Sequence, residues 1–375
     1  MMRYLDNAAT SAQKPLSVIA KMWKETLLTS VNAGRGAHRK SLRAVNGINK
    51  TAESLARLFN IADPSRIAFL PNATYALNLG MLGALSPGDH VVVTAMDHNS
   101  VLRPAALWGN YTIVPAGPDG FVDPGQVEKA ILPETALVVC THASNVCGTV
   151  QDVKKICEAA HECGALFMLD AAQSAGCMEL DAEDLGADLI AFSGHKGLLG
   201  PLGTGGLYAA PDVELRPVIT GGTGSLSESL YQPDFMPDIL HSGTMNTPAV
   251  MALGTAAEII ENPEEIFVRE RALAKDFEAD LKNMDGVIVY GTDGDNRNGT
   301  VSFNVDGTDP AVLEEYLDRQ HRIIVRAGYH CAPLAHKALG SGKTGSVRVS
   351  FGYFSTDSDR MAVSDAVYDF LNAHR

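Results

Sequence analysis

Short, nearly continuous hydrophobic runs alternate with amphipathic segments through the first half of the chain. Seven such runs are RIAFL (66–70), HVVVTA (90–95), YTIVPA (111–116), ALVVCTHAS (136–144), ALFMLDAA (165–172), LIAFSG (189–194) and GGLYAA (205–210). Strands that are buried on both faces have this composition. The segments between them, such as QDVKKICEAAHECG, place hydrophobic residues at helical spacing. The alternation predicts an α/β fold with a mostly parallel central sheet and helices on both faces.

The pattern changes after residue 250. Hydrophobic residues at helical spacing, Ile266, Leu273, Phe277, Leu281 and Met284, predict one long helix over about 250–285. The runs VIVYG, TVSFNV, RIIVRAG and SVRVSFG then predict four strands, with helices between and after them. We therefore expect a large α/β domain over 1–250 and a smaller α+β domain over 251–375. The long helix would join them, and the first 20 or so residues could pack with the smaller domain.

Composition and charge narrow the possible functions. The 375 residues are 46% hydrophobic, which is enough for a large core. The formal net charge of −14 argues against nonspecific binding to nucleic acid or to an anionic membrane. Neither a signal-peptide core nor a run of membrane-spanning length is evident, so we expect a cytoplasmic protein.

Cysteine spacing gives no sign of a metal centre. The six cysteines form no C-x-x-C pair, which disfavours zinc and thioredoxin-like sites, and we expect no metal. In a reducing compartment most of them should be small core residues. Cys331, in RAGYHCAP, follows a predicted strand and a glycine, so we expect it on a loop, where functional residues are common.

Polar residues gather where four of the predicted strands end. They are Asp97 and His98, His142 and Asn145, Asp170 and Gln173, and Ser193, His195 and Lys196. In a parallel sheet these ends lie along one edge, where ligands bind. A buried acid, a lysine and a flat ring together suit pyridoxal 5'-phosphate. Lys196 would form a Schiff base with its aldehyde, Asp170 would hold the ring nitrogen protonated, and His98 would stack on the ring.

A phosphate group would need backbone N–H groups and hydroxyls. PNAT (71–74), just before a predicted helix, could supply both. Several of these residues also have structural interpretations. Asp170, Thr74 and Ser193 could be capping or strand-end residues, and His142 is best interpreted as a structural histidine.

The motifs YLDNAAT, DHNS, THASNVCGTV, LDAAQSAG, FSGHKGLLGPLGTGGLY and RAGYHCAP follow one another in consistent order. Together they resemble the class V aminotransferase branch of fold type I pyridoxal-phosphate enzymes. The resemblance is greatest to the type II cysteine desulfurases and selenocysteine lyases. It covers nearly the whole chain, and SGHKGLLGP with DAAQ upstream is its most specific part.

The resemblance implies a role for each site residue. Lys196 is the Schiff-base lysine, Asp170 pairs with the ring nitrogen, Gln173 bonds the ring hydroxyl, His98 stacks on the ring with Asn145 beside it, and Thr74, Ser193 and His195 hold the phosphate. Thr244, in HSGTMNT, would reach the phosphate of a neighbouring subunit, which implies a homodimer with shared active sites. Cys331 would be the nucleophile. Arg348 would hold the substrate carboxylate, with Asn145 nearby.

Two departures from the family pattern leave the cofactor assignment intact. Ala73 precedes Thr74 where the family usually has a second hydroxyl residue, and Tyr329 stands where it usually has a histidine. Both put the identity of the substrate and of the sulfur acceptor in question. Arg326 and His330 could favour the Cys331 thiolate, or could be ordinary loop residues.

The implied reaction is the conversion of L-cysteine, or of L-selenocysteine, to L-alanine. The sulfur would remain on Cys331 as a persulfide, for transfer to a sulfur-acceptor protein. One alternative is another class V reaction, transamination or epimerisation, with Cys331 incidental. A second is a sulfur-carrier scaffold without catalysis, against which the presence of Lys196 and Asp170 argues.

Overall fold

A seven-stranded sheet forms the centre of the larger part of the molecule, in a computed structural model that describes residues 2–33, 36, 38–291 and 295–373. The strands lie in the order β2 (Ile67–Leu70), β8 (Gly205–Ala209), β7 (Leu189–Ser193), β6 (Leu166–Asp170), β5 (Thr135–Thr141), β3 (His90–Thr94) and β4 (Tyr111–Val114). Strands β3 to β7 are parallel, so the predicted α/β fold with a mostly parallel sheet is confirmed. Strand β8 is antiparallel to both of its neighbours.

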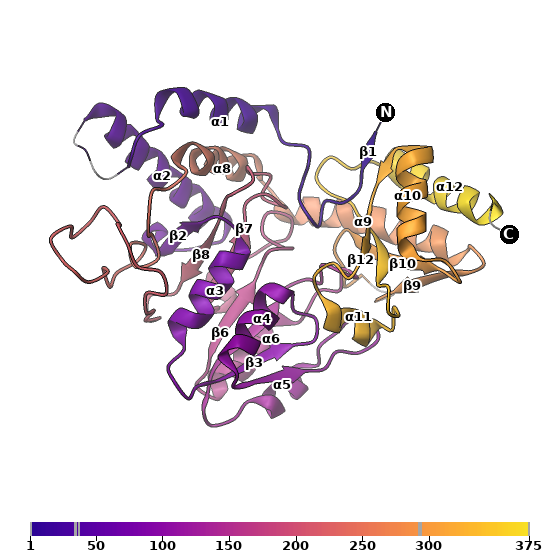
Figure 1. Cartoon of the computed structure of the whole chain (residues 1–375), viewed down its shortest axis with the longest axis horizontal. Helices are drawn as coiled ribbons and strands as arrows, with labels where there is room; N and C mark the ends of the chain where they lie inside the picture. Colours follow the sequence, from indigo (N-terminus) through magenta and orange to yellow (C-terminus); the bar gives the residue numbers. More distant parts are fainter. Residues whose placement is uncertain (1, 34–35, 37, 292–294, 374–375) are drawn as a thin grey trace.

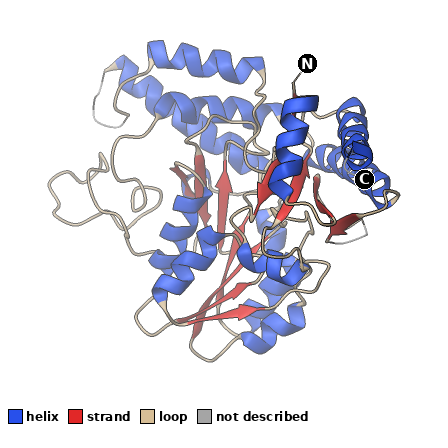
Figure 2. Ribbon diagram, turned by 45° about the vertical axis from the view of Figure 1, so that its right-hand side comes forward, coloured by secondary structure: helices blue, strands red, loops and turns tan. Residues whose placement is uncertain are grey.

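Helices cover both faces of this sheet (Figures 1 and 2). They include α2 (Arg39–Leu58), α3 (Ala73–Ala84), α4 (Asn99–Trp108), α5 (Pro124–Ala130), α6 (Val153–Glu162) and α7 (Ala182–Leu185), with a short 3-10 turn at Pro64–Arg66. Successive residues of one strand enter two different cores. Val91 and Val93 pack with α3 and α4 on one face, while Val92 packs with α2 and α6 on the other. This double burial explains why the strands are continuously hydrophobic.

The predicted single helix over 250–285 is wrong, because the chain forms two helices there. They are α8 (Thr247–Ile259) and α9 (Pro263–Lys282). Pro263 is the first residue of α9, and the side chain of Asn262 accepts a hydrogen bond from the backbone N–H of Glu265. A proline disfavours helical geometry in the residue before it and suits the first turn of a new helix, so it separates the two. Helix α8 packs against α2 and against α1 (Leu16–Leu28).

A second, antiparallel sheet lies to the right in Figure 1. Its strand order within the described residues is β12 (Arg326–Gly328), β13 (Ser346–Ser350), β10 (Thr300–Val305) and β9 (Val287–Tyr290). The associated helices are α9, α10 (Pro310–His321), α11 (Pro333–Leu339) and α12 (Asp357–Ala373). RIIVRAG, predicted as one strand, is divided into β11 (Ile323–Ile324) and β12.

The first residues of the chain connect the two sheets. Strand β1 (Arg3–Tyr4) pairs with β11, so the indigo end of the chain lies among the orange and yellow elements of Figure 1. A few residues later, Ser11 donates from its hydroxyl to the carbonyl of Lys196 at 2.7 Å. We call residues 3–14 the N-terminal segment.

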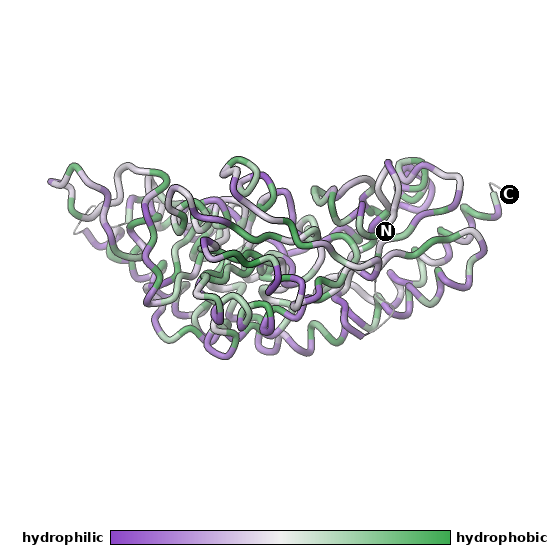
Figure 3. The backbone as a smooth tube through the Cα atoms, turned by 90° about the horizontal axis from the view of Figure 1, so that it is seen from below, coloured by the Kyte–Doolittle hydropathy of each residue, from purple (hydrophilic) through white to green (hydrophobic). Residues whose placement is uncertain are grey.

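Most of the cysteines are core residues, as expected. Cys140, Cys147, Cys157 and Cys177 are buried, and Cys331 is exposed. Cys163 is also exposed, although a core position was expected for it. It ends α6, where the helix turns towards Gly164 at the surface. Figure 3 shows hydrophilic and hydrophobic residues alternating along the outer helices, as expected for helices with one buried face. Over the described ranges, no helix has both the length and the hydrophobicity needed to cross a membrane.

Candidate active site

The carboxyl ends of four neighbouring parallel strands carry the polar residues singled out in the sequence. Strands β7, β6, β5 and β3 lie side by side, and they are followed by Lys196, Asp170 (the last residue of β6), Asn145 and His98 respectively. The structure therefore brings these four residues to one edge of the sheet. Ligands in open α/β sheets bind at this edge.

Asp170 and Lys196 form an acid and a base in a buried setting. The side chain of Asp170 is 3% exposed, and burial raises its pKa. One of its oxygens accepts a hydrogen bond from the N–H of Ala172 at 3.0 Å. Burial lowers the pKa of Lys196 to about 8, although the nearby Asp170 acts in the opposite direction. No hydrogen bond joins the two side chains within the described part of the chain, so both keep polar atoms for a ligand.

His98 is a neutral ring at the start of a helix. Its Nδ1 accepts a hydrogen bond from the N–H of Ser100 and so caps α4. Burial, and then the positive charge of Lys196, lower its pKa to about 4. The imidazole is therefore uncharged at neutral pH. A flat, uncharged and partly buried ring is suited to stacking on another ring.

A cluster of hydroxyls surrounds the N-terminus of α3. The Ser193 hydroxyl accepts a hydrogen bond from the N–H of Ala73 at 3.1 Å. The hydroxyls of Thr74 and Ser100 are 2.8 Å apart, and Thr74 is exposed. A helix N-terminus with hydroxyl groups beside it is suited to an anion such as a phosphate. The sequence analysis missed Ser100, although its place in DHNS next to His98 could have indicated it.

The N-terminal segment lies against the lysine-bearing loop. Thr10 bonds both the carbonyl and the Nδ1 of His195, at 3.1 and 3.2 Å, and burial lowers the pKa of His195 to about 4. The Lys14 amine donates to the same carbonyl at 2.9 Å. Gln173 donates from Nε2 to the carbonyl of Ala8, which leaves its Oε1 for a ligand. The sequence analysis did not identify Thr10 or Lys14, because their contacts lie more than 180 residues away along the chain.

Arg348 is a buried cation on the central strand of the smaller part of the molecule. Its side chain is 1% exposed. Nη1 donates to the carbonyl of Asn145 at 2.8 Å, and Nη2 donates to the carboxylate of Asp6 at 2.5 Å. Nε is buried and has no partner among the described residues. Asp6, which the sequence analysis also missed, is therefore the acidic partner of Arg348.

Cys331 lies on an exposed loop that is tied to the same site. The Asn145 side chain donates to the carbonyl of His330 at 2.7 Å, and the N–H of Asn99 donates to the carbonyl of Cys331 at 2.8 Å. Both His330 and Cys331 have left-handed backbones, with φ of 48° and 59°. Non-glycine residues rarely adopt this conformation, and where they do it is often at functional sites. The loop thus holds Cys331 next to the residues that follow β3 and β5.

His330 and Arg326, the two residues that could favour the Cys331 thiolate, differ in charge. Burial lowers the pKa of His330 to about 2, so its ring is neutral and supplies no positive charge. Arg326, paired across the sheet with Arg348, is the remaining cation. Tyr329, which replaces a histidine of the family pattern, donates from its hydroxyl to the carbonyl of Lys343 and is 44% exposed.

Thr244 and His142, also singled out in the sequence, lie in different environments, one exposed and the other partly buried. Thr244 is exposed and lines a hollow of about 270 Å³ together with Tyr75 and His241. His142 donates from its backbone N–H to the carbonyl of Asp170 at 3.0 Å, and burial lowers the pKa of its ring to about 4. Its Nδ1 is buried without a partner among the described residues.

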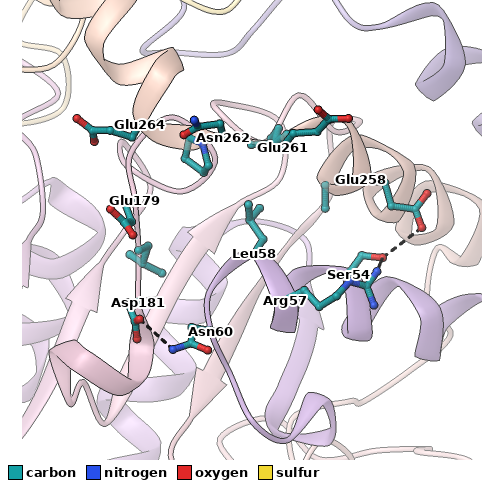
Figure 4. Close-up of a pocket in the computed structure, with 14 residues that line it drawn as sticks. Ser54, Arg57, Leu58, Asn60, Glu179, Asp181, Glu258, Glu261, Asn262 and Glu264 are labelled. Atoms are coloured by element: carbon teal, nitrogen blue, oxygen red, sulfur yellow. Dashed lines mark hydrogen bonds between the residues drawn. The ribbon is translucent and has the colours of Figure 1, made fainter.

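A second hollow, of about 660 Å³, lies between α2 and the α8–α9 connection (Figure 4). It is rich in acids, among them Glu179, Glu258 and Glu264. Hydrogen bonds within its lining join Asn60 to Asp181 and Ser54 to Glu258. None of the predicted site residues lines it, so it is separate from the site around Lys196.

Known proteins resemble this chain over almost its whole length. The profile of the aminotransferase class-V family matches residues 3–362. A probable cysteine desulfurase of Methanothermobacter thermautotrophicus is 38% identical over 369 residues, which cover 95% of this chain and 91% of the relative. A cysteine desulfurase of Haloferax volcanii is 30% identical, covering 97% and 88%.

Solved structures agree with this assignment. The apo structure of a cysteine desulfurase from Thermococcus onnurineus superposes with a TM-score of 0.92 at 32% identity, covering 99% of this chain and 95% of the other. The cysteine desulfurase CsdA of Escherichia coli, with an S-sulfonic acid, gives a TM-score of 0.88 at 27% identity, covering 99% and 94%. The fold type I architecture is thereby confirmed, and the chain belongs to the aminotransferase class-V family.

Proposed function

We propose that this protein is a pyridoxal-phosphate-dependent cysteine desulfurase, which converts L-cysteine to L-alanine and keeps the sulfur on Cys331 as a persulfide. One observation carries the proposal. The loop of Cys331 is hydrogen-bonded to Asn99 and Asn145, next to the strand ends that bear Lys196 and Asp170. The names of the relatives support the same activity.

The residues present fit the cofactor. Asp170 would pair with the ring nitrogen, and a positive charge there would lower the pKa that burial raises. Lys196 would bond the aldehyde carbon, and His98 would stack on the ring. The free Oε1 of Gln173 would accept a hydrogen bond from the ring hydroxyl. When bound, the cofactor withdraws electrons from the substrate and makes its Cα proton removable.

The phosphate would lie in the hydroxyl cluster at the start of α3. Thr74, Ser193 and His195 would hold it, together with the N–H groups of the first helical turn. Ser193 supplies the second hydroxyl of this cluster, so Ala73 does not leave the site without one. Thr244 of a second copy would add another hydroxyl in a homodimer with shared active sites. Its exposed position supports this assignment.

The chain's own groups account for the proton and sulfur transfers. Because its pKa is lowered to about 8, a fraction of Lys196 is uncharged at neutral pH and can accept the Cα proton. Arg348 would bind the substrate carboxylate through N–H groups that Asn145 and Asp6 do not use. The Cys331 thiolate would attack the substrate sulfur. A bond forms between the two sulfur atoms, the carbon–sulfur bond of the substrate breaks, and its Cβ takes a proton.

A product assay tests the function. Purified holoenzyme given L-cysteine and a reductant should release L-alanine and sulfide in equal amounts. An aminotransferase would instead form a keto acid, an epimerase would form D-cysteine, and a sulfur carrier would form none of these products. Any of those three outcomes would overturn the proposal.

Further parts of the proposal concern partners and organisation. We expect L-selenocysteine to be a second substrate and a sulfur-acceptor protein to receive the persulfide from the exposed Cys331. The net charge of −14 supports an enzyme that binds neither nucleic acid nor anionic membranes, and we propose that it is cytoplasmic. We propose a large domain over 1–250 and a small one over 251–375. The separate hydrophobic core around the second sheet, which apart from Leu5 begins at Leu273, supports the division into two domains, while residue 250 itself lies within α8, which packs against α1 and α2.

A further inference from the structure

Arg348 is held on two sides before any substrate is present. Nη1 bonds the carbonyl of Asn145, and Nη2 bonds the carboxylate of Asp6. A guanidinium carries five N–H donors in a rigid plane. Two of them are used here, and the buried Nε is left without a partner among the described residues. The two anchors therefore fix the plane of the group, while three of its five N–H donors are not used by the described residues.

Asp6 is itself held by the strand that carries Arg348. The N–H of Ala8 donates to the Ser350 hydroxyl at 2.9 Å, and the Asn7 side chain donates to the Ser350 carbonyl, also at 2.9 Å. Asp6 forms a parallel bridge with Ser350. Ser350 lies two residues after Arg348 on β13. The carboxylate is thus fixed relative to the guanidinium by backbone contacts, not only by the ion pair.

We propose that Asp6 is a positioning residue for the carboxylate of the amino-acid substrate. It balances the charge of the buried Arg348 and fixes the plane of the guanidinium, whose unused N–H groups would bind that carboxylate. This inference rests on the proposed role of Arg348 and deepens it. The substrate carboxylate would then be bound mainly through well-oriented hydrogen bonds, because Asp6 already balances the positive charge of the guanidinium.

Removal of Asp6 should weaken the contact between Arg348 and the substrate carboxylate. Without Asp6, the long side chain of Arg348 loses one of its two anchors and can rotate away from the carboxylate. A misplacement of about 1 Å can lower a rate roughly a hundredfold. If Asp6 instead competed with the substrate for Arg348, its removal would tighten substrate binding. The direction of the change separates the two cases.

The experiment compares Asp6→Ala and Asp6→Asn with Arg3→Ala as the matched control. Arg3 lies on the same segment and pairs with Asp359 at 2.6 Å, away from Arg348. Steady-state kinetics on holoenzyme would use L-cysteine and its methyl ester, which lacks the carboxylate. Calorimetry would measure the binding of L-alanine. Thermal unfolding would show that each variant is folded.

Asp6→Ala should lower kcat/KM for L-cysteine by roughly 10- to 100-fold, mostly through KM, and weaken L-alanine binding to a similar degree. The methyl ester should change by less than about threefold, because it makes no carboxylate contact. Asp6→Asn retains an oxygen that can accept from Nη2, so it should lose less. Arg3→Ala should behave as the wild type. If Asp6→Ala does not fold, the role of Asp6 is tested by comparing kcat/KM for L-cysteine in Asp6→Asn and Arg3→Ala.

Unchanged or tighter binding of L-cysteine, or an equal loss on both substrates, would overturn the role of Asp6. Arg348→Ala separates this failure from that of the proposed function. It should lower kcat/KM for L-cysteine roughly thirty- to thousandfold and spare the ester. If it does so while the Asp6 variants do not, Arg348 keeps its role and Asp6 loses its own. If it spares both substrates, the proposed carboxylate site is itself wrong.

Discussion

At the scale of single residues, Lys196 is set apart by its surroundings. Burial lowers its pKa to about 8, so part of the amine is uncharged and nucleophilic at neutral pH. Borohydride treatment of the holoenzyme should fix the cofactor on the peptide that contains Lys196, as checked by mass spectrometry. Lys196→Ala should lose turnover.

Lys14 provides an internal comparison for this labelling. Burial also lowers its pKa to about 8, and its amine bonds the carbonyl of His195. If a lowered pKa alone decided which lysine bonds the cofactor, borohydride would fix the cofactor on both lysines. Because only Lys196 follows the end of β7, we expect the label on Lys196 alone. A label found on Lys14 would show that the cofactor assignment is wrong.

Cys331 should be essential for sulfur but less so for selenium. A thiolate leaves poorly from carbon unless a nucleophile accepts the sulfur, and a selenol leaves more readily because it is more acidic. Cys331→Ala should therefore reduce L-alanine release from L-cysteine nearly to background and retain much more of it from L-selenocysteine. Wild-type enzyme briefly given L-cysteine should carry one extra sulfur on the Cys331 peptide, removable by a reductant.

Cys163→Ala is the matched control, since Cys163 is the other exposed cysteine. It should leave the rate on L-cysteine unchanged. A wild-type rate in Cys331→Ala, together with an unmodified peptide, would refute the persulfide step and favour transamination or epimerisation.

The main site residues could be predicted from the sequence because each belongs to a short motif at a strand end. Lys196, Asp170 and His98 were identified in this way, and the structure brings them to one edge. Asp6 lies in the motif YLDNAAT, but its pairing with Arg348, 342 residues away, could not be predicted, and neither could the contact of Lys14 with His195, 181 residues away. A single sequence carries no signal for such a pairing.

At the scale of elements, the loop after β5 is held against β10 by a glycine. Gly148 has φ +81°, accepts a hydrogen bond from the N–H of Asn298, and a Cβ there would lie 2.5 Å from the carbonyl oxygen of Thr300. Gly148→Ala should therefore push the loop that carries Asn145 away from β10. We expect a lower unfolding temperature and a lower kcat/KM on L-cysteine.

The backbone strain of that substitution can be separated from the clash. Gly164 has a similar φ of +77°, and a Cβ there would meet nothing within 4 Å. Gly164→Ala should cost only the left-handed conformation, about 1–2 kcal/mol, and leave activity unchanged. Equal behaviour of the two variants would contradict the packing argument.

The sequence predicted the elements that are uniformly buried, but it missed boundaries that depend on a single residue or on a change of pairing partner. All seven strands of the large sheet were located, because all but the edge strand β4 are almost entirely buried and rich in hydrophobic residues. Pro263 divides the predicted long helix, and a change of partner divides RIIVRAG, since β11 pairs with β1 and β12 with β13. The antiparallel direction of β8 depends on how the chain turns between residues 193 and 205, which periodicity does not encode.

At the scale of the whole molecule, a buried acid should make stability depend on pH. Burial raises the pKa of Glu270, on α9, to about 8. An unfolded chain releases this proton near pH 4.3, so between about pH 4.3 and 8 the folded state holds a proton that the unfolded state has lost. Stability contributed by this group therefore falls as pH rises through that window and levels off above it.

Glu270→Gln should remove this dependence, because an amide does not titrate. Its free energy of unfolding should match that of the wild type near pH 4 and exceed it at pH 8 by up to roughly 4 kcal/mol. Denaturant unfolding between pH 4 and 9 measures the difference. Glu261→Gln, at an exposed site nearby, should show no such trend. A pH-independent difference for Glu270→Gln would contradict the prediction.

The pairing of the N-terminal segment with the second sheet has a consequence for biosynthesis. Residues 3–8 are made before their partners, Ile323 to Ser350, which follow more than 300 residues later in the chain. A growing chain can form the large sheet before β13 is made, yet Asp6 has no Arg348 to pair with until the chain has grown by a further 342 residues. The pairing of Asp6 with Arg348 is therefore completed only after β13 has been made, and a chain that stops before β13 cannot form it.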